Sequence, residues 1–334
     1  MTPRISVLLP VRDARATLDL CLDSLAAQTL ADHEVVAVDD GSADGSGERL
    51  LDRAARDSRL RVLRAPPRGV VAALNHALAE AKAPLVARMD ADDVSHPSRL
   101  ALQAQRLERD RGVDVLASRV AVGPEAGEGM RAYVEWVNGL VDHEAMARDR
   151  FVESPVVHPS VAMRTSTLRG LGGYRDFDGP EDYELWLRAF DARLRFAKLA
   201  ETLIEWRDSP GRLTRLDPRY APERFRSVKL DALERGPLAA PARPLVVWGA
   251  GRIGKAWSHA LRARGLGLAA FVEVDPRKLG QRIHGVPVVP VSQATAWPGA
   301  LHLAAVGQPG AREQIRSEAR HLGLSEERDF VAVA

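Results

Sequence analysis

The stretch Arg88-Met89-Asp90-Ala91-Asp92-Asp93 follows the short apolar run Pro84-Leu85-Val86-Ala87. The apolar run predicts a buried strand that ends on a cluster of carboxylates. Asp90 and Asp92 are two residues apart, so extended backbone projects both side chains to the same side. Converging carboxylates repel each other unless a cation joins them. Mg²⁺ takes one or two carboxylates together with water and substrate phosphates, so the cluster indicates an enzyme that handles a nucleoside diphosphate. A solvated turn or a helix cap would account for the same residues.

The residues before this cluster alternate between apolar runs and segments with helical spacing. The expected strands are Ile5–Val11, 34–38 and 61–63, and the expected helices are 16–28, 48–56 and 70–82. Such alternation predicts βαβ units and a largely parallel α/β sheet. Ligands bind beyond the carboxyl ends of the strands in these sheets. Pro10 to Asp13, Asp39-Asp40 and Asp90 to Asp93 are all expected at that edge.

The residues after the cluster complete the first domain and then predict a second one. Helices are expected at 97–110, at 183–189 and at 222–234. The Pro-containing stretch 236–244 marks the best boundary between the two domains. A new strand then begins at Pro244. We therefore expect a first domain at 1–215, a helix and linker at 216–243, and a small Rossmann-like α/β domain at 244–334. A length of 334 residues suits two domains.

Composition excludes several classes of protein. Hydrophobic residues make up 46% and charged residues 28% of the chain, as in soluble globular proteins. The net charge is +2 and no long basic run is present, so nucleic acid is not an expected partner. Cys21 is the only cysteine, which excludes an intrachain disulfide and disfavours structural zinc. No stretch resembles a signal peptide or a membrane span of about 20 apolar residues, so a cytoplasmic location is expected.

A set of motifs, in order along the chain, resembles the family 2 glycosyltransferases of GT-A fold. On the nucleotide side they are 5–13, 21–29, 38–46, 69–75 and 88–93 with Pro97 and Arg99-Leu100; on the acceptor side they are His158-Pro159, Gly172-Gly173-Tyr174 and 180–188. The resemblance covers residues 4–215. It implies the GT-A fold, a mostly parallel sheet flanked by helices. Many relatives carry Tyr-Asn where this chain has Arg12-Asp13, which leaves the nucleotide open.

The resemblance also implies a reaction. A hydroxyl of a glycan or lipid-linked acceptor attacks the anomeric carbon of a nucleotide-sugar, with inversion and without a covalent enzyme intermediate. UDP-sugar is the favoured donor, Mn²⁺ or Mg²⁺ the expected cofactor, and surface polysaccharide, glycolipid or glycan the expected product of a hexosyltransferase-type enzyme. Peripheral association with the inner face of a membrane is compatible with this interpretation.

The resemblance assigns roles on the nucleotide side. Asp39 accepts a hydrogen bond from the base, Asp40 and Ser42 shape the pocket, and Asp13 reaches the nucleoside. Helix capping is the alternative for Asp39 and Asp40. The nucleotide-side candidates are Pro10, Asp13, Asp39, Asp40, Ser42, Arg68 and Asp90. An exposed turn arginine is the alternative for Arg68.

The metal ligands implied by the resemblance lie in the acid cluster. Asp92 is the first candidate ligand, and Asp90 is the second, with ribose or metal-bound water as its other contacts. Asp93 contacts either group. His158 is an extra ligand, an acceptor contact or a structural residue.

The general base is expected at the start of the helix that runs through Trp186. Asp182 is the first candidate and Glu181 the second. A helix N-terminus stabilises a carboxylate, which also explains acids there without any catalytic role. Trp186 and Arg188 are expected in packing and ion pairing. Trp206-Arg207 and Thr214 are expected to line the nucleotide side.

The second domain carries Gly249-Ala250-Gly251-Arg252-Ile253-Gly254 between an expected strand and helix, with Glu273 and Asp275 at the spacing of a ribose-binding acid. About 90 residues remain there, too few for a full dinucleotide fold. Residues 280–289 are similar to the small nucleotide-binding-like domains that precede sugar acyltransferases. Three interpretations stay open: a scaffold, favoured; a nucleotide or nucleotide-sugar site at Gly249, Gly251 and Gly254; and NAD(P) binding, the least favoured.

Two rival functions follow. The first is a bifunctional or NAD(P)-dependent oxidoreductase centred on the glycine-rich loop. The second is a binding protein without catalysis, which the presence of Asp39, Asp92 and Asp182 argues against.

Overall fold

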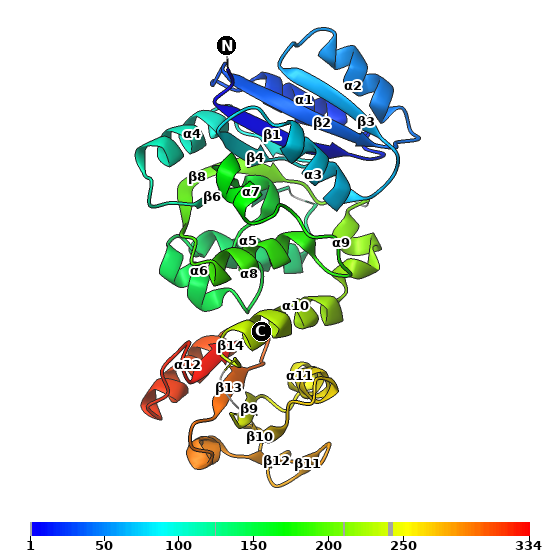
Figure 1. The fold of residues 1–334 in the computed structure, drawn as a ribbon. Coiled ribbons are helices and arrows are strands. Elements are labelled where there is room, and N and C mark those ends of the chain that lie inside the picture. The colour runs from blue at the N-terminus through cyan, green and yellow to red at the C-terminus, as the bar shows by residue number, and fades with distance from the viewer. Residues whose placement is uncertain (1, 124, 210, 240–242) are drawn as a thin grey trace. The chain divides into compact units, whose positions relative to one another are not determined.

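The computed structural model describes residues 2–123, 125–209, 211–239 and 243–334. The chain forms two compact units (Figure 1). The first unit comprises Met1–Met146 and Pro155–Tyr220, and the second comprises Ala147–Ser154 and Ala221–Ala334. Within the expected linker at 236–244, residues 240–242 lie outside the described residues. No helix in the described ranges is long and apolar enough to cross a membrane.

The first unit is built on one sheet of order β3-β2-β1-β4-β7-β6-β8-β5. Its strands are β1 (Ile5–Val11), β2 (His33–Asp40), β3 (Leu60–Ala65), β4 (Leu85–Arg88), β5 (Val94–Ser95), β6 (Val115–Val122), β7 (Ala162–Arg164) and β8 (Phe196–Trp206). Strands β3, β2, β1 and β4 run parallel, as do β6 and β8. β7 is antiparallel to both of its neighbours, and β5 to β8. The predicted mostly parallel α/β sheet is therefore confirmed.

Helices cover both faces of this sheet because its strands are apolar on both sides. In β1, Ile5, Val7 and Leu9 belong to one core cluster and Leu8 to the other, the alternation expected of a strand. The first cluster takes in residues of α1 (Leu18–Ala26), α2 (Ser46–Ala54), α4 (Arg99–Arg109) and α5 (Glu128–Gly139). The second takes in residues of α3 (Val70–Glu80), α6 (His143–Asp149), α7 (Thr165–Gly170) and α8 (Glu181–Asp191). Two short 3₁₀ turns, η1 (His158–Ser160) and η2 (Pro218–Tyr220), and α9 (Leu213–Leu216) complete the unit.

The second unit has a smaller sheet of order β11-β12-β10-β9-β13-β14, parallel except for β11. The strands are β9 (Leu245–Trp248), β10 (Leu268–Val272), β11 (Arg282–Ile283), β12 (Val286–Val289), β13 (Leu301–Ala304) and β14 (Phe330–Ala332). They accompany α10 (Pro222–Arg235), α11 (Arg252–Ala263), η3 (Val291–Ala296) and α12 (Ala311–His321). This arrangement confirms the predicted small Rossmann-like domain.

The division of the chain is not linear. The segments expected from sequence, 1–215, 216–243 and 244–334, are continuous, whereas the second unit also includes residues 147–154. Composition along the chain carries no sign of this, because the segment joins the second unit only through contacts with residues far away in sequence.

Candidate functional site

The predicted nucleotide residues lie at one edge of the first sheet. Strands β1, β2 and β3 are parallel, with Val11 paired to Asp39 and Asp39 paired to Arg64, so their carboxyl ends meet at this edge. Pro10 lies within the ladder, paired to Val38. The sheet topology thus brings together residues that are up to about 50 positions apart in sequence.

Asp39 is buried, with 4% of the residue exposed. Its Oδ1 accepts a hydrogen bond from the Ser42 amide at 3.0 Å, and its Oδ2 lies 3.7 Å from Arg64 Nε. A Cβ atom at Gly47 would lie 2.3 Å from Oδ2. The absence of a side chain at Gly47 is therefore what makes room for this carboxylate.

Asp40 holds the turn that leads into α3. Its Oδ1 accepts from the Arg68 amide at 2.8 Å and its Oδ2 from the Gly69 amide at 2.9 Å, while Arg12 Nη1 lies 3.5 Å from Oδ2. Both amides lie just before α3 (Val70–Glu80), so Asp40 fixes the turn that precedes this helix and does not cap the helix after β2. Arg68 takes part through its backbone, and its side chain is exposed.

Asp13 and Ser42 fasten the loops after β1 and β2 to each other. The Asp13 amide donates to Ser42 Oγ at 3.0 Å, and Asp13 Oδ1 accepts from the Ala43 amide at 2.8 Å. Asp13 has a φ of 46°, in the left-handed region where Asp is one of the tolerated residues. These loops form a defined rim around the edge where Asp39 ends its strand.

The acid cluster follows β4 as predicted, and each carboxylate has a different partner. Arg88 Nη2 donates to Asp90 Oδ1 at 2.6 Å. Ser209 Oγ donates to Asp92 Oδ2 at 2.7 Å, and the Arg207 amide donates to Asp93 Oδ1 at 2.9 Å.

Burial raises the pKa of Asp92, and it raises the pKa of Asp93 well above its usual range; the charge of Asp90 adds to both shifts. Asp93 Oδ2 is buried and has no hydrogen-bond partner in the part of the chain that the structure describes. Such an excess of buried carboxylate oxygens fits a hard divalent cation. Within the described ranges, no three His, Cys, Asp or Glu side chains are arranged as a metal-binding group. The site therefore fits a cation held by one or two carboxylates and completed by substrate oxygens.

The two base candidates begin α8 and differ in exposure. Glu181 is 4% exposed, and its Oε2 accepts from the Tyr220 hydroxyl at 2.6 Å. Burial raises the pKa of Glu181. Asp182 is half-buried, and its Oδ1 accepts from the Tyr183 amide at 2.7 Å. Of the two carboxylates, Asp182 is the more accessible.

The acid cluster and the start of α8 meet around Arg88 and Tyr174. The charges of Asp90 and Glu181 both act on the buried Arg88 guanidinium. Burial raises the pKa of Tyr174, and the charges of Glu181, Asp182 and Asp90 contribute to the same direction. Residues about 90 positions apart in sequence thus share one electrostatic environment.

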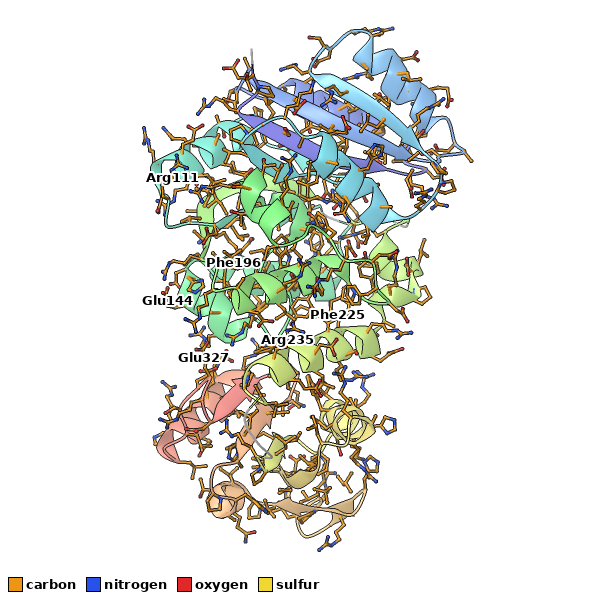
Figure 2. All side chains as sticks on the ribbon, viewed as in Figure 1. Arg111, Glu144, Phe196, Phe225, Arg235 and Glu327 are labelled. Carbon is orange, nitrogen blue, oxygen red and sulfur yellow. The ribbon has the colours of Figure 1, made fainter. Side chains whose placement is uncertain are left out.

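His158 lies behind Tyr174. Its Nε2 is 2.9 Å from the Tyr174 hydroxyl, and its ring stands edge-on to Trp186 at 5.8 Å. Burial, together with the charge of Arg88, lowers the pKa of His158 well below its usual range. Trp186 also packs edge-on against Phe196, with the ring centroids 6.3 Å apart. Phe196 is labelled in Figure 2. These aromatic contacts correspond to the structural alternative for His158 and to the packing role expected of Trp186.

The segment after β8 brings residues to the site that sequence reasoning missed. Ser209 is 117 positions from its partner Asp92, and Tyr220 is 39 positions from Glu181. Arg212 stacks over the Trp206 ring, with Cζ 4.1 Å from the ring centroid, and its charge acts on Asp92 and Asp93. Only the concentration of polar residues after an apolar strand could have pointed to this segment.

In the second unit, the Glu273 carboxylate lies against the glycine-rich loop at 249–254 and binds one of its amides. Glu273 Oε2 accepts from the Ala250 amide at 3.0 Å and from Lys278 Nζ at 2.9 Å. Its Oε1 accepts from the Val274 and Asp275 amides. A Cβ at Gly254 would lie 1.8 Å from Gly249 O, whereas one at Gly251 would meet nothing within 4 Å. The loop thus closes on the strand-end acid, and Gly254 permits the tight packing.

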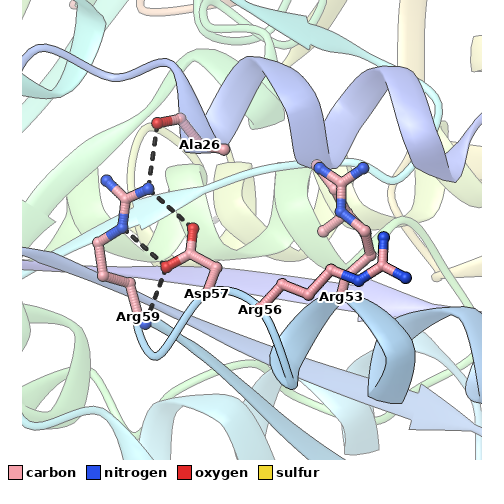
Figure 3. Close-up of a pocket in the computed structure, with 6 residues that line it drawn as sticks. Ala26, Arg53, Arg56, Asp57 and Arg59 are labelled. Atoms are coloured by element: carbon pink, nitrogen blue, oxygen red, sulfur yellow. Dashed lines mark hydrogen bonds and ion pairs between the residues drawn. The ribbon is translucent and has the colours of Figure 1, made fainter.

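A hollow of about 430 Å³ lies elsewhere on the first unit (Figure 3), between α1, the end of α2 and the start of β3. It is lined by Leu22, Ala26, Arg53, Arg56, Asp57 and Arg59. Arg59 pairs with Asp57 at 2.8 Å and donates to Ala26 O at 3.1 Å, which satisfies a carbonyl at the end of α1. None of the predicted site residues lines this hollow.

Comparison with known proteins assigns the first unit to a family. The Glycosyl transferase family 2 model matches residues 6–171, and a CoA binding domain model matches residues 242–312. The putative glycosyltransferase EpsE of Bacillus subtilis (strain 168) is 30% identical over 225 residues, which are 66% of this chain and 78% of that protein. The UDP-Gal:alpha-D-GlcNAc-diphosphoundecaprenol beta-1,3-galactosyltransferase of Escherichia coli is 26% identical over 211 residues, 62% of this chain and 75% of that protein.

Solved structures show the same fold. S. aureus TarS 1-349 aligns with a TM-score of 0.55 at 20% identity, over 70% of this chain and 65% of that chain. TarS 1-349 in complex with UDP-GlcNAc aligns with a TM-score of 0.54 over 70% and 66% of the two chains. The family match, the relatives and the GT-A-like sheet point to the same assignment. The chain belongs to glycosyl transferase family 2 and carries a Rossmann-like C-terminal domain.

Proposed function

We propose that this protein is an inverting, metal-dependent hexosyltransferase that moves a sugar from a UDP-sugar to a hydroxyl of a glycan or lipid-linked acceptor. The observation that carries the proposal is the acid cluster at Asp90 to Asp93, which follows β4 and in which Arg88 Nη2 donates to Asp90 Oδ1 at 2.6 Å. The second acidic group is the helix start at Glu181-Asp182, and the charge of Glu181 acts on the same buried Arg88. The first group suits a leaving diphosphate and the second suits an attacking hydroxyl.

The donor proposal rests on Asp39 and on the relatives. Asp39 lies at the carboxyl end of β2, one residue before the strand ends, and one of its oxygens is held by the Ser42 amide, so its carboxylate has a fixed direction at the edge of the sheet. A carboxylate in this place accepts a hydrogen bond from the imino group of a base. Two relatives carry UDP-sugars in their names, the E. coli galactosyltransferase and the TarS complex with UDP-GlcNAc, which supports uracil as the base.

The metal proposal rests on the carboxylate oxygens of the acid cluster. Asp92 and Asp90 would hold Mn²⁺ or Mg²⁺, whose preferred ligands are oxygens. When bound, the cation supplies positive charge to the departing diphosphate. Arg88 keeps Asp90 in place through its hydrogen bond at 2.6 Å, and Arg212 adds a cation beside Asp92.

Asp182 is the proposed general base. A base must lie within reach of the acceptor hydroxyl and must be ionised to take its proton. Glu181 meets neither condition well, because it is buried, has a raised pKa and is engaged by the Tyr220 hydroxyl. Asp182 is more exposed and lies at the N-terminus of α8, where the helix dipole favours the ionised form. Glu181 therefore has a structural role beside the base, in which its hydrogen bond with Tyr220 holds it in place.

A ligand-binding panel tests the donor and metal proposals. Thermal shifts of the wild type are measured with UDP, GDP, dTDP, CDP and NAD(H), each with and without Mn²⁺. We expect a shift with UDP that requires Mn²⁺ and is lost in Asp92→Ala. The control Asp191→Ala, at the other end of α8, should keep the shift. A shift with NAD(H) alone, independent of Mn²⁺ and of Asp92, would refute the proposal in favour of an oxidoreductase centred on the glycine-rich loop.

A further inference from the structure

Residues 147–154 belong to the second unit although the chain on both sides of them belongs to the first. The chain leaves the first unit after Met146, which is fully buried in one of its core clusters. It returns at Pro155, and the next two residues, Val156 and Val157, are again buried in the first unit. Within the excursion, Phe151 is 2% exposed. The segment is therefore packed and does not behave as a surface loop.

Three parts of the second unit hold this segment. Asp149 is 2% exposed and forms an ion pair with Arg316 of α12. Lys229 of α10 donates to Val152 O at 2.7 Å. Arg150 pairs with Glu327 at 3.0 Å. A helix, a second helix and a loop thus converge on eight residues of chain.

Asp149, Arg316 and Lys229 are largely buried, whereas Glu327, the partner of Arg150, is exposed, so the attachment depends most on the first three residues. The Arg316 side chain is 11% exposed and also reaches Glu326 Oε1 at 2.8 Å. Lys229 is 6% exposed, and burial lowers its pKa. Asp149 also lies 3.2 Å from Arg148 Nε, but the Arg148 side chain is 45% exposed, so Arg316 is its buried partner. Breaking a buried ion pair costs more than losing a surface pair, so loss of either Asp149 or Arg316 should loosen the segment.

The end of the segment leads directly into the acceptor side of the transferase site. Three residues separate Ser154 from His158, whose Nε2 lies 2.9 Å from the Tyr174 hydroxyl. Tyr174 in turn lies in the field of Glu181 and Asp182. Lys198 Nζ donates to Pro155 O at 3.3 Å, within the first unit. The path from residue 154 to the proposed base therefore runs through covalent bonds and hydrogen bonds between described residues.

We propose that Asp149 and Arg316 are positioning residues for the acceptor side of the transferase site. By holding residues 147–154, the second unit restrains residues 155–158, and through His158 it restrains Tyr174 beside Glu181 and Asp182. The catalytic consequence rests on the proposed function, whereas the restraint itself does not. This gives the Rossmann-like unit a role in the enzyme that requires no ligand of its own.

Peptide-resolved hydrogen exchange of the full chain tests the restraint. We compare the wild type with Asp149→Asn and Arg316→Met, and with Arg264→Met as a matched control. Arg264 forms ion pairs with Asp231 and Glu234 in the same unit, away from residues 147–154. In the two test variants, we expect peptides covering 155–161 and 171–176 to exchange at least about tenfold faster. Peptides of β2 should be unchanged, and Arg264→Met should leave all of these peptides protected.

Two results would overturn the proposal. One is faster exchange of 147–154 without any change at 155–161. The other is an equal change in Arg264→Met, which would show a general loss of stability in the second unit. If Arg316→Met does not fold, Arg316→Lys keeps the positive charge but loses the second contact with Glu326; the same peptides should then exchange faster by a smaller factor, and unchanged exchange there would equally refute the restraint.

A binding and turnover measurement separates positioning from damage to the donor site. With Mn²⁺ present, the Kd of UDP for Asp149→Asn should stay within about twofold of the wild type, while transferase turnover falls about tenfold or more. A matching loss of UDP affinity would contradict a role confined to the acceptor side. If UDP binds no form of the protein, the proposed function fails, but the exchange experiment still decides whether the restraint exists.

Discussion

Asp39 of the first unit and Glu273 of the second are both acids at the carboxyl end of a parallel β-strand, beside a glycine-containing turn, and they are used differently. Among the described residues, Asp39 accepts one hydrogen bond, from the Ser42 amide, and its second oxygen lies 3.7 Å from Arg64 Nε. Glu273 accepts from three backbone amides and from Lys278. The same sequence pattern thus produces one acid that can still take a ligand and one that the fold has already satisfied.

The difference teaches that position alone does not make a binding acid. What matters is how many donors the surrounding loop supplies. In the first unit, Asp40 accepts hydrogen bonds from the Arg68 and Gly69 amides of the loop before α3, so these donors are not directed at the carboxylate of Asp39. In the second unit, Glu273 has no such neighbour and takes the amides itself. We therefore expect chemistry in the first unit and a structural role for the glycine-rich loop.

The largest effect is expected from Asp182, because we propose that catalysis takes place in the first unit. Asp182→Asn should lower kcat by about 10²- to 10⁴-fold, the usual contribution of a general base, and should leave UDP binding intact. Asp191→Asn, at the far end of the same helix, should keep wild-type turnover. The measurement is UDP release from a UDP-sugar in the presence of acceptor and Mn²⁺. Wild-type turnover in Asp182→Asn would remove the base assignment.

A pair of glycine variants tests whether the loop of the second unit is structural. In Gly254→Ala the new Cβ meets Gly249 O, and in Gly251→Ala it meets nothing within 4 Å. Gly254→Ala should therefore lose about 1–3 kcal/mol of unfolding free energy, as overpacked cores do, whereas Gly251→Ala should lose little. Urea denaturation followed by tryptophan fluorescence gives both values. Equal stability of the two variants would mean that the loop can open, contrary to the comparison.

Neutralising the two strand-end acids tests the comparison directly. Asp39→Asn removes a charge-assisted hydrogen bond to the ligand and should weaken UDP binding about 10- to 150-fold, since hydrogen bonds to charged groups contribute about 1.5–3 kcal/mol. Glu273→Gln should lower the Tm but leave the Kd of UDP unchanged. Isothermal titration with UDP and Mn²⁺ provides the first value and a thermal melt the second. Loss of UDP affinity in Glu273→Gln alone would reverse the two roles.

The smallest effect concerns one buried histidine in each unit. Burial lowers the pKa of His158 well below its usual range and that of His302 to about 4. In the unfolded chain a histidine titrates near 6.5. Because the unfolded state then binds protons that the folded state does not, stability falls as the pH drops below about 6.5, by at most about 1.4 kcal/mol per pH unit for each histidine.

Melting temperatures between pH 7.5 and 5 check this expectation. His158→Gln and His302→Gln should each flatten the pH dependence, since glutamine does not titrate. A variant that keeps the full wild-type slope would show that its histidine is already protonated in the folded protein.

The sequence predicted the regular parts of the fold well because their signals are local. Strand β1 has the predicted bounds, and the helix expected at 70–82 is α3 (Val70–Glu80). The helix expected at 222–234 is α10 (Pro222–Arg235). Apolar runs and helical periodicity carry this information over a few residues at a time. In the first unit, the strands β5, β6, β7 and β8 were not predicted. β5 and β7 are two and three residues long, and β8 alternates weakly, with exposed residues in its middle.

The site was predicted in part. The carboxyl edge of the sheet gathers Asp39, Asp40 and Asp90 to Asp93 as expected, since parallel strands fix where their ends lie. The partners of these acids were not foreseeable, because Ser209 and Tyr220 reach them across long sequence separations. The roles of Asp39, Asp92 and Asp182 remain predictions, for which the structure supplies the surroundings.

The excursion of residues 147–154 has a consequence for recombination. The family match at 6–171 includes this segment. A chimaera that joins residues 6–171 of this chain to the C-terminal domain of a relative would therefore combine residues 147–154 with a domain that did not evolve to bind them. We expect such a domain replacement to succeed only when residues 147–154 are replaced together with the C-terminal domain. The replacement of this one domain therefore requires two separate segments of the gene to be exchanged. Insertions and deletions within residues 147–154 should therefore be tolerated only when Arg316 and Lys229 also change.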